Sequence, residues 1–229
     1  MLELQKIKPA EPEDAVVVYF ASHGTAQGDR FYLMPTDLGY LGSRSRLTQQ
    51  GLETILSHSI SDIELEQTFE KIDARQILLV IDACNSGQAL EAEEKRRGPM
   101  NSKGLAQLAY EKGMYILTAA QSYQAALEAA RLGHGYLTYA LVEEGLKTNV
   151  SDRAPKDGQV LVREWLDFAT ARVPEMQLEK IEEQRKMGRQ LEQLIKFAES
   201  DAGKDRNVQR PRVFYRREAE SSPLIVARP

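Results

Sequence analysis

The chain has 229 residues, 42% of them hydrophobic, which suffices for one large domain or one domain with an appendage. Its 30 basic and 34 acidic residues give a net charge of −4, which argues against nucleic acid as the main partner because no dense basic field is available. With one cysteine, no apolar run long enough to cross a bilayer and no secretory leader, we expect a soluble, cytoplasmic protein of a reducing compartment.

Two strands are predicted near the start of the chain. Residues 15–20 form an unbroken apolar run rich in β-branched and aromatic residues, which is typical of a buried strand. This run ends in a predicted small-residue loop, 21–24, that contains His23. Residues 31–34 predict a short strand closed by Pro35, and residues 38–60 are expected to wrap the surface.

The central feature of the sequence is a second apolar run, 77–81, which stops at an acid. Such a run suits a strand buried on both faces, and we expect a tight polar loop after it, from Asp82 to Gly87, that contains Cys84. A helix is predicted before it, opened by a capping box at Ser61–Glu64 and reaching about residue 72.

This strand–helix–strand order favours parallel pairing of the two apolar strands. If they are neighbours in register, His23 and Cys84 emerge side by side at one edge of the sheet. Ligands bind at the carboxyl ends of the strands in open α/β sheets, so this edge is the predicted functional site.

The second half of the chain predicts strands and helices joined by connecting segments. We expect an exposed connector over 88–104, and a long charged helix over 175–200 that is either solvated on the domain or a docking helix for another domain or chain. Pro174 predicts a fresh helical start. The other predicted elements are a strand over 114–118, helices over 135–146 and from 160 to about 173, and terminal strands over 212–215 and 224–227.

A cysteine beside a histidine can perform nucleophilic catalysis. A thiol with an unperturbed pKa of ~8.5 is only a few per cent thiolate at neutral pH, and an imidazole can take its proton and later return it to a leaving amine. Of the three histidines, only His23 follows a buried-strand pattern. The structural alternative is that Cys84 is a small buried hydrophobe and His23 a solvated loop residue.

The residues from Val17 to Gly24, followed by those from Leu79 to Gly87, resemble the caspase-like cysteine peptidases, especially bacterial metacaspase and orthocaspase relatives. The similarity spans roughly residues 14–147. It continues through four further segments: 32–37, 116–120, 124–128 and 134–139.

The resemblance implies a three-layer α/β/α sandwich with a mostly parallel central sheet. It also implies roles for individual residues: Cys84 as nucleophile, His23 as general base and acid, and the backbone N–H groups of Gly24 and Cys84 as oxyanion donors. Asp82 matches the pocket acid of the branch that cleaves after arginine or lysine, and Gln124 falls where a further substrate-binding residue lies. A strand-closing acid that accepts backbone N–H bonds is the alternative for Asp82.

The family often has a cleavable segment between a larger and a smaller part. Here the parts would be residues 14–90 and 105–229 of one peptidase domain over 1–229, with a linker over 91–104. Arg96 and Arg97 are candidate self-cleavage positions in it, and a solvated charge run is the alternative.

The sequence also departs from the family pattern. Only about 14 residues precede the histidine strand, so the usual N-terminal strand–helix–strand unit has no counterpart before it. A fragment, a processed product or a minimal version completed by another chain would each fit. An incomplete sheet would favour docking of a regulatory domain or partner chain at its edge.

The sequence therefore predicts a cysteine endopeptidase that hydrolyses protein or peptide substrates after arginine or lysine. This chemistry requires no metal or organic cofactor, and no Asp-rich loop indicates the calcium activation known among metacaspases. Two other readings are a catalytically inert caspase-like scaffold and a nucleotide- or phosphate-binding domain. The last is weakened because neither strand-end loop has a phosphate-cradling glycine pattern.

Overall fold

The computed structural model describes residues 10–27, 30–42, 47–85, 103–121, 135–153, 155–192, 209–215 and 222–228. The chain forms two compact units. The first comprises Met1–Ala120 with Arg212–Leu224, and the second comprises Gln121–Pro211 with Ile225–Pro229.

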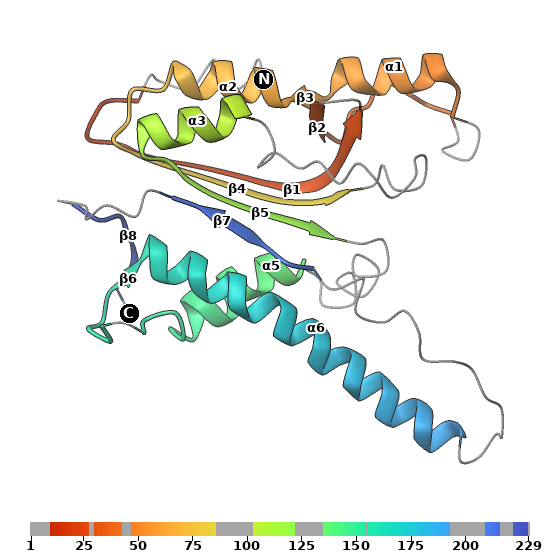
Figure 1. Ribbon diagram of the computed structural model, residues 1–229, viewed down its shortest axis with the longest axis vertical. Helices are drawn as coiled ribbons and strands as arrows, with labels where there is room; N and C mark the ends of the chain where they lie inside the picture. Colours follow the sequence, from red (N-terminus) through yellow and green to blue (C-terminus); the bar gives the residue numbers. More distant parts are fainter. Residues whose placement is uncertain are drawn as a thin grey trace. The chain divides into compact units, whose positions relative to one another are not determined.

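The first unit is built on a six-stranded mixed sheet (Figure 1). β1 and β4 pair in parallel at its centre, as predicted, and Figure 1 shows β5 running in the same direction. The outer strands β2, β3 and β7 run antiparallel to their neighbours. In spatial order the strands are β3 (Ile60–Ser61), β2 (Arg30–Met34), β1 (Ala15–Gln27), β4 (Gln76–Asn85), β5 (Tyr115–Gln121) and β7 (Arg212–Phe214).

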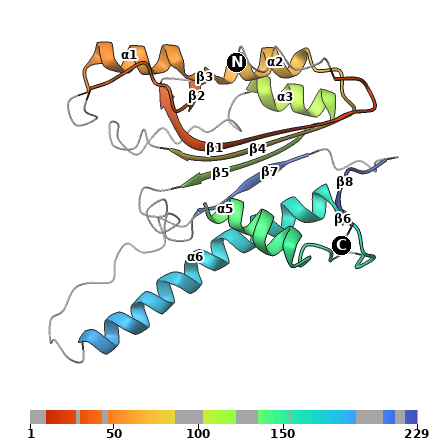
Figure 2. The same ribbon diagram turned by 180° about the vertical axis from the view of Figure 1, so that it is seen from behind.

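Three helices of this unit lie on one face of the sheet in both views (Figures 1 and 2): α1 (Gln49–His58), α2 (Asp62–Glu70) and α3 (Lys103–Lys112). Alternate residues of each strand meet them, because successive side chains of a strand point to opposite faces. The predicted α/β class is therefore confirmed. The buried core of this face is Phe31, Leu33, Leu65, Phe69, Ile77, Leu79, Ile81, Ala83, Ala109, Met114 and Ile116.

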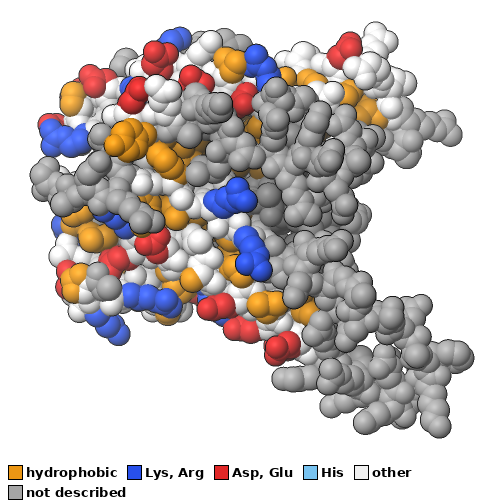
Figure 3. All heavy atoms as spheres, in the orientation of Figure 1, with side chains coloured by type: hydrophobic (Ala, Val, Ile, Leu, Met, Phe, Trp, Pro, Cys, Tyr) orange, Lys and Arg blue, Asp and Glu red, His pale blue; other side chains and the backbone are white. Residues whose placement is uncertain are grey.

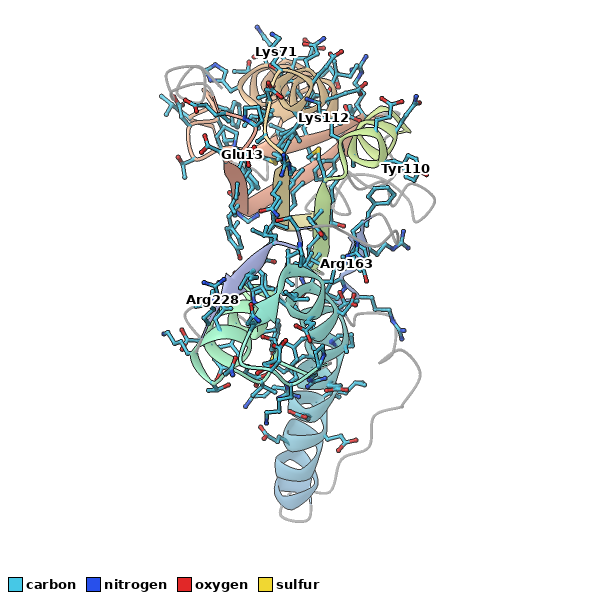
Figure 4. All side chains as sticks on the ribbon, turned by 90° about the vertical axis from the view of Figure 1, so that its left-hand side faces the viewer. Glu13, Lys71, Tyr110, Lys112, Arg163 and Arg228 are labelled. Carbon is cyan, nitrogen blue, oxygen red and sulfur yellow. The ribbon has the colours of Figure 1, made fainter. Side chains whose placement is uncertain are left out.

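Side chains satisfy free backbone groups at the start of helix α2 and just beyond its end. The predicted capping box is present: the Ser61 hydroxyl accepts from the Glu64 N–H, and the Glu64 carboxylate accepts from the Ser61 N–H. After the other end, Lys112 Nζ of α3 donates to the carbonyls of Glu70 and Ile72, each at 2.7 Å (Figure 4). These bonds join α2 to α3 and position the turn that leads into β4.

The second unit packs helices around two short strands. Its elements are α5 (Tyr136–Tyr139), the π-helix η6 (Ala140–Lys147), β6 (Val160–Leu161), α6 (Val162–Glu192) and β8 (Ile225–Ala227). The indole Nε1 of Trp165 in α6 donates to the Leu141 carbonyl of η6 at 2.8 Å. A Cβ at Gly145 would lie 3.1 Å from two atoms of that indole ring, so glycine permits the close packing.

Helix α6 is continuous through Pro174, where the sequence predicted a new start. Arg172 accounts for part of this continuity. Its guanidinium donates to Glu144 of η6 at 2.6 Å and to Glu179, one turn beyond the proline, at 2.8 Å. The hydrogen bond with Glu144, and then the one with Glu179, raise the pKa of Arg172 above its ordinary value, and the hydrogen bond with Arg172 lowers the pKa of Glu179.

Two helices of the first unit were not predicted. Residues 38–60 were expected to wrap the surface, with no helix assigned to them, and they include α1; α3 begins at Lys103, within the connector expected over 88–104. Thr48 caps α1 by accepting from the Gly51 N–H at 3.1 Å. Only Gly51 and Ile55 of α1 are buried, so this helix lies largely at the surface, and its sequence has no extended apolar face that would predict it.

Acidic and basic side chains are interspersed among the described residues of the face in Figure 3. None of the helices in the described ranges combines the length and apolar character needed to cross a membrane.

Candidate active site

The backbones of His23 and Cys84 are neighbours in the sheet. β1 and β4 pair in parallel from Ala15 with Gln76 to Gly24 with Asn85, and in this register the Cα partner of His23 is Cys84. The prediction that the two apolar strands are neighbours in register, with these two residues side by side, is confirmed.

Both residues lie within strands, although the sequence predicted loops. β1 continues past Phe20 to Gln27, and β4 continues past Ile81 to Asn85. The reason is pairing on more than one side: β2 folds back along β1 from His23 onward, which keeps the small polar residues of β1 extended. Within the paired part of β1, His23 and Gly24 are the two residues with partners in both β2 and β4.

His23 and Asp82 share one face of the sheet. Phe20 of β1 packs on the core cluster to which Ile81 and Ala83 of β4 belong, so Asp82 and His23 fall on the opposite face by strand alternation. The Cα partner of Asp82 is Ala21, two residues before His23. A carboxylate therefore lies next to the strand position of the histidine, on the same side of the sheet.

The two side chains differ in exposure. His23 is exposed, whereas Asp82 is only 6% exposed. An accessible imidazole can exchange protons with a substrate, and a buried carboxylate can select a cationic group that is brought to it. This arrangement is compatible with the roles that the resemblance implies.

Gly24, a predicted oxyanion donor, is buried beside the core. A Cβ at this position would lie 2.6 Å from Cζ of Phe31, so the glycine is required by the packing of that ring. Nothing in the sequence assigns Phe31 a role in the site. The only signal was its place at the start of the short strand that follows the histidine strand.

Several predicted positions fall outside the described residues: Gln124, Arg96 and Arg97, and also Gly87. Of the predicted linker 91–104, residues 103 and 104 begin α3, and the others lie outside the described ranges. The division into a larger part, 14–90, and a smaller part, 105–229, stays a prediction.

His58 does not belong to this edge of the sheet: it is exposed at the end of α1. Within the described ranges, no group of three or more histidine, cysteine, aspartate or glutamate side chains is arranged to hold a metal ion.

A cysteine and a histidine at paired positions of two adjacent strands, with a glycine N–H nearby, can support nucleophilic acyl transfer. The comparisons with known proteins point the same way. The model of the caspase domain matches residues 2–195, a span that contains His23, Asp82 and Cys84. Neither a curated protein nor a solved structure gave a significant match. Because the family model covers most of the chain, this protein belongs to the caspase-domain family of cysteine peptidases.

Proposed function

We propose that the protein is a cysteine endopeptidase that cleaves peptide bonds after arginine or lysine with a dyad of Cys84 and His23. The observation that supports this most strongly is the register of β1 and β4, which pairs the two backbones directly in a chain of the caspase-domain family. The alternative, an inert caspase-like scaffold, shares this fold but requires no proton exchange between the two residues.

In the proposed reaction, His23 takes the proton of the Cys84 thiol as the sulfur attacks the carbonyl carbon of the scissile bond. The carbonyl oxygen becomes an oxyanion, which accepts hydrogen bonds from the backbone N–H groups of Gly24 and Cys84. Collapse of this intermediate breaks the C–N bond, and His23 gives its proton to the leaving amine. His23 then removes a proton from water, which hydrolyses the thioester and restores the thiol.

We assign the choice of substrate to Asp82. Its carboxylate is 6% exposed and lies on the face of the sheet that His23 shares. A carboxylate held in such a place binds a guanidinium or ammonium group and repels an acidic side chain. Gln124 is proposed as a second substrate-binding residue, on the strength of the family resemblance alone.

We also propose self-processing in the linker, as in the metacaspases that this chain resembles. Arg96 and Arg97 are suitable cleavage positions for an enzyme that cuts after basic residues. Cleavage there would be seen by mass spectrometry as two fragments. It should disappear in Cys84→Ala and in the double variant Arg96→Gln/Arg97→Gln, of which only the second should retain activity on peptides.

A regulatory partner chain or domain is proposed at β1. β2 pairs with β1 only from His23 to Gln27, so the first residues of β1, Ala15–Val18, pair with β4 on one side and with no other described strand. Val17 in this stretch is 58% exposed. An extended segment of another polypeptide could add to such an edge, and we expect this interaction to take place in the cytoplasm.

The function is tested with fluorogenic peptides that end in arginine, lysine or aspartate, assayed with and without calcium. We expect cleavage after arginine and lysine, and loss of at least about 10³-fold in kcat for Cys84→Ala and His23→Ala. His58→Ala is the matched control because this histidine is exposed on α1, and it should leave the rate unchanged.

Folding of each variant is checked by circular dichroism. A wild-type protein that cleaves none of these peptides under either condition would favour the inert scaffold. Cleavage that survives Cys84→Ala would instead exclude this cysteine as the nucleophile.

A further inference from the structure

We propose that Phe31, assisted by Ser22, is a positioning residue that fixes the His23–Gly24 segment for catalysis. The inference rests on the proposed function, because it concerns the geometry of the same site. It adds two residues to which neither the family resemblance nor the sequence assigned a part in the reaction.

The first observation is how β1 is held around the histidine. His23 pairs with Met34 of β2 on one side and with Cys84 of β4 on the other, and Gly24 pairs in the same way with Leu33 and Asn85. Among the described residues, every other paired residue of β1 has a partner strand on one side only. The β2 strand is therefore the element that restrains this segment from the second side.

The second observation is a side-chain bond beside the histidine. The Ser22 hydroxyl donates to the Met34 carbonyl at 3.1 Å, and this bond is partly buried. Met34 is the β2 residue that pairs with His23. The hydroxyl thus ties the residue before the histidine to the residue opposite it, in addition to the backbone pairing.

The third observation is the packing of the Phe31 ring on Gly24. A Cβ at Gly24 would lie 2.6 Å from Cζ and 3.0 Å from Cε2 of Phe31, and 3.4 Å from Cβ of Ala83. The ring therefore occupies the space that a side chain at Gly24 would take. Phe31 is only 5% exposed and belongs to the core under the sheet, which leaves the ring little freedom to move.

These contacts matter for the reaction because Gly24 is the proposed donor to the oxyanion. A donor stabilises the transition state only when it is held within a few tenths of an ångström of its place, and a ring packed on its Cα supplies such a restraint. Ala83, on the other side of the glycine, directly precedes the Cys84 nucleophile. The glycine is thus confined between the Phe31 ring and the residue that precedes the nucleophile.

The test compares Phe31→Leu with Phe69→Leu. Phe69 is a matched control because it belongs to the same core, is 2% exposed, and lies on α2 away from the glycine. On an arginine peptide, we expect Phe31→Leu to lower kcat about tenfold with KM changed less than about twofold, since an interaction made in the transition state is weakened. Phe69→Leu should lose stability without this loss of kcat. Ser22→Ala should lower kcat by a smaller factor, about threefold.

A double variant separates positioning from general destabilisation. Gly24→Ala alone should lose nearly all activity, because the new Cβ meets the ring, and Phe31→Leu should recover part of it by making room. Gly24→Ala combined with Phe69→Leu should show no recovery. If Phe31→Leu does not fold, Phe31→Met, which retains more side-chain volume, replaces it in the same comparison.

Hydrogen exchange provides a readout that does not depend on peptide cleavage. We expect the Gly24 amide to exchange faster in Phe31→Leu than in Phe69→Leu when the two are compared at equal overall stability. If the wild type cleaves no peptide but the Gly24 amide still exchanges faster in Phe31→Leu, the proposed peptidase function is wrong. The proposal that Phe31 restrains the His23–Gly24 segment is then still supported. Equal exchange in the two variants, or equal kcat in an active enzyme, would overturn the inference.

Discussion

The two strands that form the candidate site, β1 and β4, have similar sequences and different surroundings. Each contains five successive apolar residues, and the two runs, 16–20 and 77–81, pair residue for residue. In β4, residues 77–80 are fully buried. In β1, by contrast, Val17 is 58% exposed and Tyr19 is 41% exposed.

The difference follows from the position of each strand in the sheet. β4 lies between β1 and β5 in the sheet, whereas β2 pairs with the second side of β1 only from His23 onward. The proposed nucleophile therefore lies near the end of a strand whose preceding residues are fully buried, and the proposed general base lies where β1 gains its second partner strand. An apolar run predicts a strand in both cases, but it does not predict how much of that strand its neighbours cover.

The largest effect within this comparison is expected at the polar end of β4. Asp82→Ala should lower kcat/KM for an arginine peptide by about 100-fold, because a charge-assisted hydrogen bond to the guanidinium is lost. The ratio of rates on arginine and citrulline peptides measures this directly, since citrulline has nearly the shape of arginine without its charge.

Asp62→Ala is the control for removing an equally buried carboxylate outside the candidate site. Asp62 is also 6% exposed but lies in the first turn of α2, so its replacement should leave the arginine-to-citrulline ratio unchanged. A preference for arginine that survives Asp82→Ala would show that another group forms the pocket.

An intermediate effect is expected in the middle of the two strands. Val80→Thr places a hydroxyl where the side chain is fully buried, which should cost about 2 kcal/mol in the free energy of unfolding. Val17→Thr makes the same change where the side chain is 58% exposed and should change stability by less than about 0.5 kcal/mol.

Both substitutions keep a β-branched side chain, so strand propensity is nearly unchanged. Urea unfolding of the two variants measures the difference. Equal losses would mean that another molecule or segment covers Val17 in solution, and chemical cross-linking would then identify it.

The smallest effect is expected at the start of the strands, where Arg75 and Glu13 form an ion pair at 3.3 Å. Their side chains are 61% and 80% exposed, so water and salt screen the attraction. Arg75→Ala should therefore lower the free energy of unfolding, measured by urea titration, by no more than about 0.5 kcal/mol, and added salt should reduce even this small loss. A larger, salt-sensitive loss would show that this pair fixes the two strands together.

The sequence predicted the centres of these strands better than their ends. The apolar runs identified β1 and β4 and their parallel pairing. Polar and small residues such as Ser22 and Asp82 locally indicate loops. The strands continue through them because neighbouring strands pair alongside, and a local sequence pattern carries no information about those neighbours. The site residues His23 and Cys84 could be proposed from sequence, but the packing of Phe31 on Gly24 depends on how β2 folds back.

Helix boundaries show the same dependence on tertiary contacts. The capping box at Ser61 predicted the start of α2, since the interaction is local. Pro174 predicted a new helical start, but α6 continues through it, and Arg172 binds Glu144 in η6 and Glu179 on the far side of the proline. No local pattern in the sequence identifies Glu144 as that partner, 28 residues away.

The central claim is that His23 activates Cys84 for attack on a substrate that Asp82 selects. Intact-mass analysis with peptide mapping, after incubation with an arginine chloromethyl ketone or its aspartate counterpart, tests all three parts. We predict one adduct on Cys84 with the arginine reagent, little with the aspartate reagent, and at least a tenfold slower reaction in His23→Ala. Equal labelling by the two reagents, or a labelling rate that His23→Ala leaves unchanged, would contradict the account.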